Sequence, residues 1–111
     1  MRRLGLIYRA TNKLTGQVYI GQTNNYAKRL KEHIRYSLQK HRREYKNKFH
    51  EAIRTHGYSN FEWSILYSGI PEHLIDAVEK WTIANYNSIE NGYNRHPGGR
   101  TVNVKLNGSA T

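Results

Sequence analysis

Two short apolar segments joined by a tight polar link are the feature that most constrains how this chain can fold. Residues Leu4–Thr11 and Gln17–Thr23 are rich in tyrosine, isoleucine and valine, and the five residues between them have the composition of a hairpin turn. If the turn is centred between residues 13 and 14, Tyr8 and Tyr19 stand opposite each other on one face of the hairpin. The sequence therefore predicts a domain that begins with an antiparallel strand pair.

Three helices and one more strand are predicted beyond the hairpin. Apolar residues recur at every fourth position after a cap at Asn24 or Asn25, and Gly57 marks the end of a second helix. The order β-β-α-α-β-α fits an α+β domain in which about three helices flank a small three-stranded antiparallel sheet. The predicted helices span about 26–40, 45–56 and 72–86, and the predicted strand spans 61–67. The apolar stripe on one face of the first predicted helix consists of Tyr26, Leu30, Ile34 and Leu38.

Length and composition exclude several other kinds of protein. With 111 residues the chain has room for one domain, expected at 1–97 and followed by a flexible tail at 98–111. The lack of cysteine excludes a disulfide scaffold, a thiol nucleophile and a cysteine-ligated zinc site. No apolar run approaches the roughly 18–20 residues that span a bilayer, and the N-terminal run is too short for a signal peptide. A soluble intracellular domain is expected.

Positive charge is concentrated in the middle of the chain. The formal net charge is +10, and residues 26–56 hold ten lysines and arginines against three glutamates. Such a field attracts phosphate backbones and makes nucleic acid the leading partner, although a basic run is often only a solvated surface. The residues expected to contact a nucleic-acid backbone are Lys28, Arg35, Lys40, Arg42, Arg43, Lys46 and Lys48.

A carboxylate interrupts the apolar face of the third predicted helix. When the helix is projected at about 100° per residue, Glu79 falls between Ile75 and Ile83. Burying a carboxylate is costly unless it is paired, protonated or bound to a metal. Glu79 therefore either reaches water or a cation at the edge of the stripe, or serves a site beneath the helix. The other apolar residues of the predicted stripe are Leu74, Val78 and Trp81.

Two further groupings have simpler interpretations when each is taken alone. Arg29 and His33 lie one helical turn apart and share a face beside the stripe of the first helix. A pair of solvated cations is the favoured interpretation of these two residues alone. A cross-strand pair such as Tyr8 and Tyr19 is more often packing than chemistry.

These positions together resemble the signatures of the GIY-YIG nuclease superfamily. Residues 6–8, Leu-Ile-Tyr, are similar to the first signature, with leucine in place of its glycine and a glycine one position earlier. Residues 19–21, Tyr-Ile-Gly, match the second signature at the family spacing. Further downstream, 28–33 resembles the arginine helix, 78–81 the glutamate helix, and 91–94 the asparagine motif of phage and intron-encoded homing endonucleases. Five elements in the right order cover most of the chain.

The resemblance implies a divalent-metal-dependent endonuclease that hydrolyses DNA phosphodiester bonds, by nicking or by double-strand cleavage, in the cytoplasm of a bacterial or phage-infected cell. Glu79 would bind a single Mg²⁺ or Mn²⁺ ion. Tyr8 would act as general base or position water, supported by Tyr19. The other residues implied for the site are Arg29, which would bind the scissile phosphate, His33 or His41, which would assist it, and Asn94, which would hold the site together.

Other functions also fit part of the sequence. A non-catalytic nucleic-acid-binding module or an RNA-binding structural protein would explain the basic middle region, but not an inward-facing Glu79. Homing relatives carry a separate DNA-recognition region, and the 17 residues that follow Asn94 leave no room for one. The chain is therefore expected to be a stand-alone nuclease of low sequence specificity or a catalytic fragment.

Overall fold

The computed structural model describes residues 4–98 and consists of a small sheet with helices on both of its faces. The expected tail at 98–111 lies outside the described residues, apart from Gly98. Among residues 4–98, no helix has the length and apolar character needed to cross a membrane. The elements in chain order are β1 (Leu4–Asn12), β2 (Val18–Thr23), α1 (Tyr26–Tyr36), the 3-10 helix η1 (Arg43–Lys46), α2 (Lys48–His56), the 3-10 helix η2 (Tyr58–Asn60), β3 (Phe61–Pro71) and α3 (Glu72–Tyr86).

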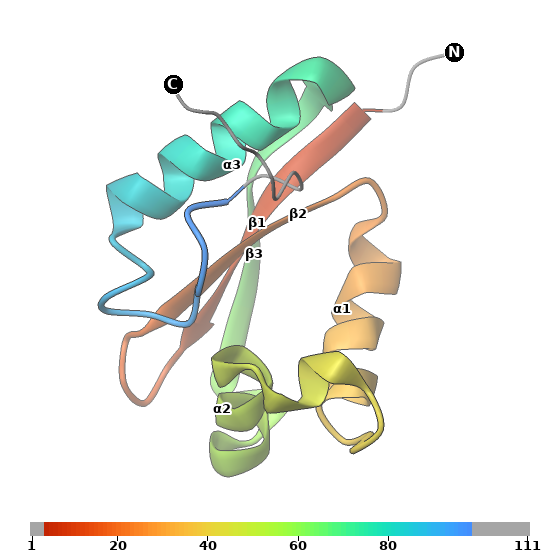
Figure 1. Ribbon diagram of the computed structural model, residues 1–111, viewed down its shortest axis with the longest axis vertical. Coiled ribbons are helices and arrows are strands. Elements are labelled where there is room, and N and C mark those ends of the chain that lie inside the picture. The colour runs from red at the N-terminus through yellow and green to blue at the C-terminus, as the bar shows by residue number, and fades with distance from the viewer. Residues whose placement is uncertain (1–3, 99–111) are drawn as a thin grey trace.

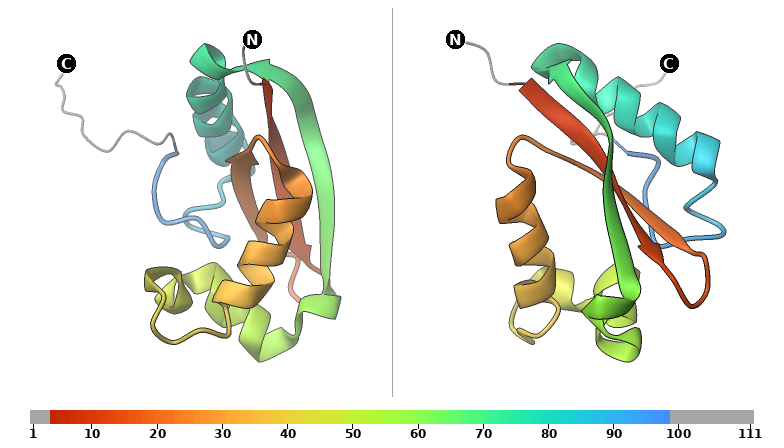
Figure 2. Two further views of the ribbon diagram at one scale, coloured as in Figure 1. Left: turned by 90° about the vertical axis from the view of Figure 1, so that its right-hand side faces the viewer. Right: turned by 180° about the vertical axis from the view of Figure 1, so that it is seen from behind.

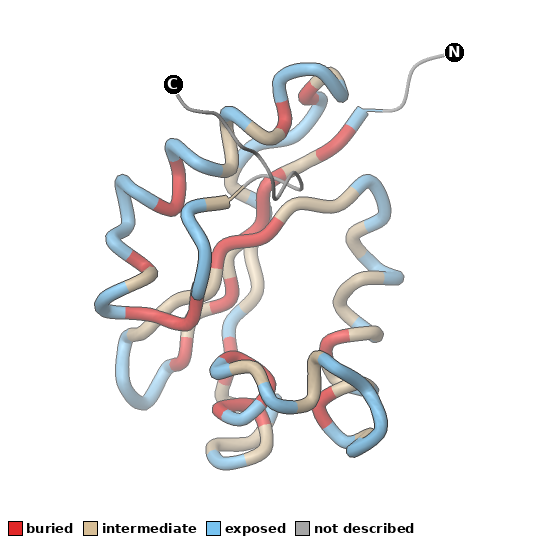
Figure 3. The backbone as a smooth tube through the Cα atoms, viewed as in Figure 1, coloured by how far each residue is buried: buried red, intermediate tan, exposed pale blue. Residues whose placement is uncertain are grey.

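The sheet is antiparallel with the strand order β2-β1-β3, so β1 is central and β2 forms one edge. Helix α3 lies on one side of the strands, and α1 and α2 lie on the other (Figures 1 and 2). Buried residues follow β1 and the inner sides of these helices (Figure 3). This arrangement confirms the predicted α+β class and element order.

Each face of the sheet has its own core. On the α3 side, β1 and β2 contribute Ile7 and Ile20, which are fully buried against isoleucines of α3 and β3. On the α1 and α2 side, Ala10 packs with aromatic residues, among which Phe49 stacks on Tyr19 at a centroid distance of 4.3 Å. A chain with nine tyrosines thus fills the second core mainly with rings, and these rings surround the functional groups described below.

The first helix is shorter than predicted. Asn25 caps it as expected, with its side chain accepting a hydrogen bond from the Lys28 backbone N–H, but the helix ends at Tyr36. Arg54 of α2 donates to the carbonyl of Ser37 at 2.8 Å, which satisfies an acceptor at this helix end. The expectation that Leu38 continues the apolar stripe is wrong, because Leu38 follows the helix and is 69% exposed.

The hairpin register also differs from the prediction. Tyr8 pairs with Gly21 rather than with Tyr19. The turn comprises residues 13–16, because Asn12 accepts a hydrogen bond from the Gly16 N–H at 2.7 Å while Gly16 adopts a φ of 81°. Its centre therefore lies between residues 14 and 15. The two tyrosines still share a face, as diagonal neighbours with ring centroids 6.2 Å apart.

The third helix has the predicted bounds but a narrower buried stripe. Ile75 and Ile83 are buried, as the projection requires, with Glu79 half-buried between them. The expectation that Leu74 and Trp81 belong to the stripe is wrong, since they are 45% and 56% exposed. A three-stranded sheet offers a narrow surface, so the apolar residues on the flank of the helix stay in solvent. The predicted strand 61–67 extends to Pro71.

Candidate active site

Tyr8 occupies the centre of the α1 side of the sheet because its cross-strand neighbour is a glycine. Its side chain is 2% exposed and lies directly over Gly21. A Cβ atom at position 21 would come 2.5 Å from the Tyr8 hydroxyl, closer than such atoms approach each other. Gly21 therefore leaves the space that the phenol fills, which explains why the second signature ends in glycine.

A chain of hydrogen bonds leads from Tyr8 into the interior. The Tyr8 hydroxyl lies 2.6 Å from Nε2 of His33, and Nδ1 of His33 lies 2.8 Å from Nε2 of His50. His33 is 1% exposed and His50 is fully buried. The interpretation of Arg29 and His33 as two solvated cations is therefore wrong for His33, which points into the core and meets Tyr8.

Arg29 and Glu44 form a charged pair at the solvent side of this chain. Arg29 Nη2 donates to Glu44 Oε1 at 3.0 Å, and Nη1 donates to Glu32 Oε1 at 3.2 Å. Burial lowers the pKa of Arg29, but Tyr8 and Glu44 together raise it above its usual value, so the guanidinium stays charged. Its side chain is 25% exposed, which leaves one side open to a ligand.

Burial controls the protonation of the three hydrogen-bonded rings. It raises the pKa of Tyr8 well above the ordinary value, and Tyr19 adds to this shift while Arg29 opposes it. It lowers the pKa of His33 to about 2 and that of His50 to about 4, and the charge of Arg29 acts in the same direction on both. The phenol and both imidazoles are consequently neutral at neutral pH.

Three of these groups also have metal-ligand chemistry. One ligand atom each from His33, Glu44 and His50 lies within 4.8 Å of the others, and no other group of three such side chains is found in the described range 4–98. Two observations weigh against a cation there. The two imidazoles already bond to each other, and the guanidinium of Arg29 bonds to Glu44 and repels positive charge.

Glu79 reaches the β2 edge of the sheet from the opposite face. Its Oε1 accepts a hydrogen bond from Nε2 of Gln22 at 2.8 Å, and the same amide donates to Asp76 Oδ1 at 2.7 Å. Glu79 also raises the pKa of both Tyr8 and Tyr19, although other groups contribute more. Because β2 is an edge strand, the carboxylate from one face and the tyrosines from the other act on the same region.

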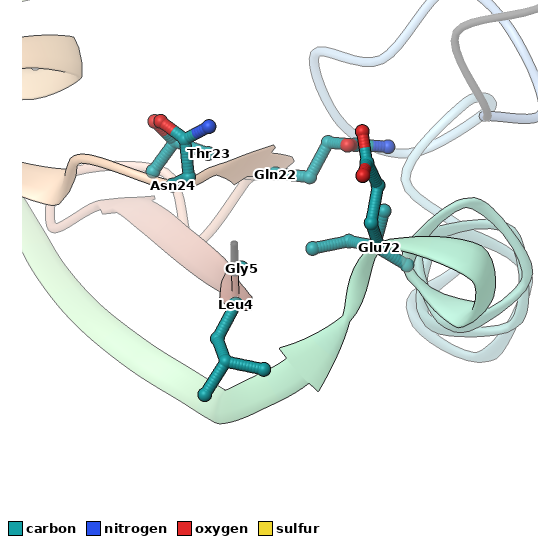
Figure 4. A pocket seen from close by; sticks show the side chains of 7 residues that line it. Leu4, Gly5, Gln22, Thr23, Asn24 and Glu72 are labelled. Atoms are coloured by element: carbon teal, nitrogen blue, oxygen red, sulfur yellow. The ribbon is translucent and has the colours of Figure 1, made fainter. Parts of the chain in front are cut away.

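A cavity of about 210 Å³ lies where these groups approach one another. Tyr19 and Glu79 line it, together with Asn47 and Asn94. A second pocket of about 270 Å³ opens between the start of β1, the end of β2 and the start of α3, and Gln22 is among its lining residues (Figure 4). Gly5, the glycine one position before the first signature, lines this pocket next to Ile75. A Cβ atom at position 5 would lie 2.3 Å from the Ile75 side chain, so the close packing of β1 against α3 requires glycine there.

The Asn94 side chain joins the segment that follows α3 to β2 by hydrogen bonds. Its side-chain oxygen accepts from the Ile20 N–H at 2.9 Å, and its Nδ2 donates to the Ile20 carbonyl at 2.8 Å. The Ser88 hydroxyl donates to the same oxygen at 2.7 Å. Asn94 is 7% exposed, so all three bonds are shielded from water and hold β2 in place next to Tyr19.

Replacing Asn94 with alanine is expected to lower the free energy of unfolding by about 2–4 kcal/mol, because Ile20 loses both partners for its buried backbone groups. Chemical denaturation of the two proteins measures the difference. Asn91→Ala is the matched control, since Asn91 is exposed in the same loop, and it should change stability by less than about 0.5 kcal/mol. Equal effects of the two substitutions would contradict this role of Asn94.

The structure thus brings most of the candidate site residues together, and it adds others. Tyr8, Tyr19, Arg29 and His33 form one cluster on the α1 side of the sheet. His41 is exposed in the connection that follows α1, and the position beside Arg29 is taken by Glu44. The residues that sequence analysis did not select are Gln22, Glu44 and His50. The basic residues expected to contact a backbone, Lys28, Arg35, Lys40, Arg42, Arg43, Lys46 and Lys48, are all exposed.

Comparisons with known proteins agree with this geometry. The family model of the GIY-YIG catalytic domain matches residues 4–94. A mutant of the catalytic domain of the intron endonuclease I-TevI is 30% identical, with a TM-score of 0.74 over 86% of this chain and 97% of that one. The catalytic domain of the homing endonuclease I-TevI is 32% identical, with a TM-score of 0.68 over 80% of this chain and 95% of that one. A search of curated proteins finds no significant match.

Proposed function

This chain belongs to the GIY-YIG family and is a nuclease catalytic domain, and we propose that it is a divalent-metal-dependent endonuclease that hydrolyses DNA phosphodiester bonds. The observation that carries the proposal is the contact between the Tyr8 hydroxyl and His33, with the charges of Arg29 and Glu79 both acting on that phenol. These four groups supply what a phosphodiester requires: a positioned nucleophile and a way to stabilise developing negative charge.

The donor set at Glu79 fits a hard divalent ion. The carboxylates of Glu79 and Asp76 both accept a hydrogen bond from the Gln22 amide nitrogen, and they offer oxygen atoms, the ligands that Mg²⁺ and Mn²⁺ prefer. Glu79 also borders a cavity that has room for water and a phosphate oxygen. We therefore propose that Glu79 holds one Mg²⁺ or Mn²⁺ ion. When bound, the ion would stabilise charge on the phosphate and orient water.

Side chains of this protein are proposed to bind the phosphate and to activate the attacking water. Arg29 is proposed to bind the scissile phosphate, because its planar guanidinium is already fixed on one side by Glu44 and open on the other. Tyr8 is proposed to orient the attacking water and to accept its proton, with Tyr19 supporting its position at a centroid distance of 6.2 Å. Asn94 keeps β2 in register beneath these groups.

A cleavage assay tests the proposal directly. We expect the full chain to cut duplex, single-stranded or branched DNA when Mg²⁺ or Mn²⁺ is added, and a chelator to stop the reaction reversibly. Gels of supercoiled plasmid distinguish nicking from double-strand cleavage. If the protein binds these DNAs and none is cut with either ion, it is a non-catalytic binding module, and the proposed function is wrong.

DNA binding is expected to depend on salt through the exposed basic residues between α1 and α2. Each phosphate contact contributes about 0.9 to the slope of log affinity against log salt concentration. Single alanine substitutions at Lys40, Arg42 or Lys46 should therefore reduce that slope by about 0.9 each, measured by fluorescence anisotropy. Lys13→Ala is the matched control, because Lys13 is exposed in the β1–β2 turn away from this segment. An unchanged slope in all three variants would place the DNA elsewhere.

A further inference from the structure

His50 is a buried, hydrogen-bonded histidine that the mechanism above does not use. It lies at the inner end of the chain of contacts from Tyr8 through His33, at 2.6 and 2.8 Å. Its backbone is fixed by the Asn47 side chain, which accepts from the His50 N–H at 2.7 Å and caps α2. A polar ring that is fully buried and aimed at a candidate active-site histidine requires an explanation.

Tyr8 itself creates the need for a proton acceptor. Because burial raises the pKa of its hydroxyl, Tyr8 carries its proton at neutral pH and has no charge with which to take another. It can accept a proton from water only by giving up its own. Nε2 of the neutral His33 ring lies 2.6 Å away and accepts that proton when the ring carries its own proton on Nδ1.

His33 is poorly suited to keep that proton. Burial, the charge of Arg29 and the neighbouring His50 together lower its pKa to about 2. His50 is better placed, because both the carboxylate and the backbone carbonyl of Glu44 oppose the lowering of its pKa by burial, Arg29 and Arg54. The Glu44 carboxylate lies 3.8 Å from Nε2 of His50. Of the two imidazoles, His50 is therefore the one that holds positive charge more easily.

We propose that Tyr8, His33 and His50 form a proton relay in which His50, beside Glu44, receives the proton that Tyr8 releases when it deprotonates the attacking water. His50 and Glu44 are then positioning residues that act through His33. The inference rests on the proposed endonuclease function and deepens it by naming where the proton goes.

The transfers balance in three coupled steps. The O–H bond of water breaks and a bond forms between that proton and the Tyr8 hydroxyl oxygen. The original Tyr8 proton moves to Nε2 of His33, and the proton on Nδ1 of His33 moves to Nε2 of His50. The hydroxide forms a bond to phosphorus while the scissile P–O bond breaks, and the leaving alkoxide takes a proton from solvent. The positive charge on His50 is compensated by the Glu44 carboxylate. The reverse sequence returns the proton to Tyr8, from which solvent removes it.

The substitution His50→Gln tests the relay. Glutamine can still accept a hydrogen bond from His33 and so preserves its orientation, but it cannot take a proton. We expect the single-turnover cleavage rate to fall about 100-fold at unchanged DNA affinity and thermal stability. His56→Gln is the matched control, since His56 is on the same helix and outside the chain of contacts, and its rate should equal that of the wild type.

A proton inventory distinguishes the relay from simple support of His33. In mixtures of light and heavy water, the wild-type rate should curve with deuterium content because three protons move together, whereas His50→Gln, which lacks the last transfer, should give a flatter curve. Glu44→Gln provides an independent check at a half-exposed position. We expect its single-turnover cleavage rate to fall about 10-fold, and the double variant with His50→Gln to be no slower than His50→Gln alone. If His50→Gln does not fold, the rate of Glu44→Gln decides alone, and a rate equal to that of the wild type overturns the relay.

The outcomes separate this inference from the proposed function. If the wild type does not cleave DNA, the proposed function fails first. If the wild type cleaves and both variants cleave at its rate, or if His50→Gln slows with an unchanged proton inventory, His50 is only structural and the relay is wrong. A slower rate of His50→Gln together with a flatter proton inventory supports the relay.

Discussion

Replacing Glu79 with glutamine is expected to reduce metal-dependent DNA cleavage by at least about 1,000-fold. The removed charge is the one that we propose to hold the divalent ion, and a positioned metal contributes several kcal/mol to stabilising the transition state of phosphoryl transfer. Fold and DNA affinity should change little, because the glutamine carbonyl can still accept the hydrogen bond from Gln22. Initial rates on plasmid DNA in Mg²⁺ and Mn²⁺, beside anisotropy measurements of binding, give both quantities.

The control for this substitution is Glu72→Gln, which removes a carboxylate from the exposed start of the same helix. It should leave the rate of cleavage unchanged. Residual cleavage by Glu79→Gln at a tenth of the wild-type rate or more would mean that the ion is held elsewhere. In residues 4–98 the one group of three metal-ligating side chains found close together is His33, Glu44 and His50.

Replacing Tyr8 with phenylalanine is the second change with a large expected effect. The ring still fills the space over Gly21, but the hydroxyl that meets His33 is lost. We expect the single-turnover rate to fall by about 100- to 10,000-fold, the range typical of a lost general base. The free energy of unfolding should fall by only about 1–2 kcal/mol, since one buried hydrogen bond is removed.

Tyr67→Phe serves as the comparison, because Tyr67 is a partly exposed tyrosine of β3 whose ring contacts Trp81 and lies outside the site. Both variants are measured at saturating DNA and metal, so that a change in binding does not appear as a change in rate. A Tyr8→Phe protein that cleaves within threefold of the wild type would show that the phenol neither activates nor orients the water, and the proposed mechanism would have to begin from another group.

Local patterns in the sequence predicted the fold well because they act over short distances. The bounds of α3 follow from Pro71 and from the spacing of its isoleucines, and Gly57 ends α2 with a φ of 85°. The register of the hairpin was mispredicted because it depends on the bond between Asn12 and Gly16, which composition does not reveal. A shift of one residue in the turn centre moved the two tyrosines from opposite to diagonal positions.

The candidate site was predictable where a residue conflicts with its surroundings. Glu79 stood out because a carboxylate interrupts an apolar stripe, and the structure places it half-buried against Gln22. His50 and Glu44 gave no comparable signal, since a histidine next to Phe49 and a glutamate in a basic segment are ordinary. Their contacts with His33 and Arg29 arise only when α1, η1 and α2 pack together, a tertiary arrangement that periodicity does not encode.

The two hydrogen bonds between Asn94 and Ile20 also bear on the order in which parts of the candidate site become fixed during synthesis of the chain. Seventy-four positions separate these two residues, so β2 is synthesised long before the side chain that secures it. Tyr8, Gly21 and His33 can associate early, whereas the backbone beneath them is locked only when the last motif has emerged. In a chain interrupted before residue 94, β2 would lack the hydrogen bonds from Asn94 that hold it in place. We therefore expect the candidate site to reach its final geometry only when translation of the domain is nearly complete.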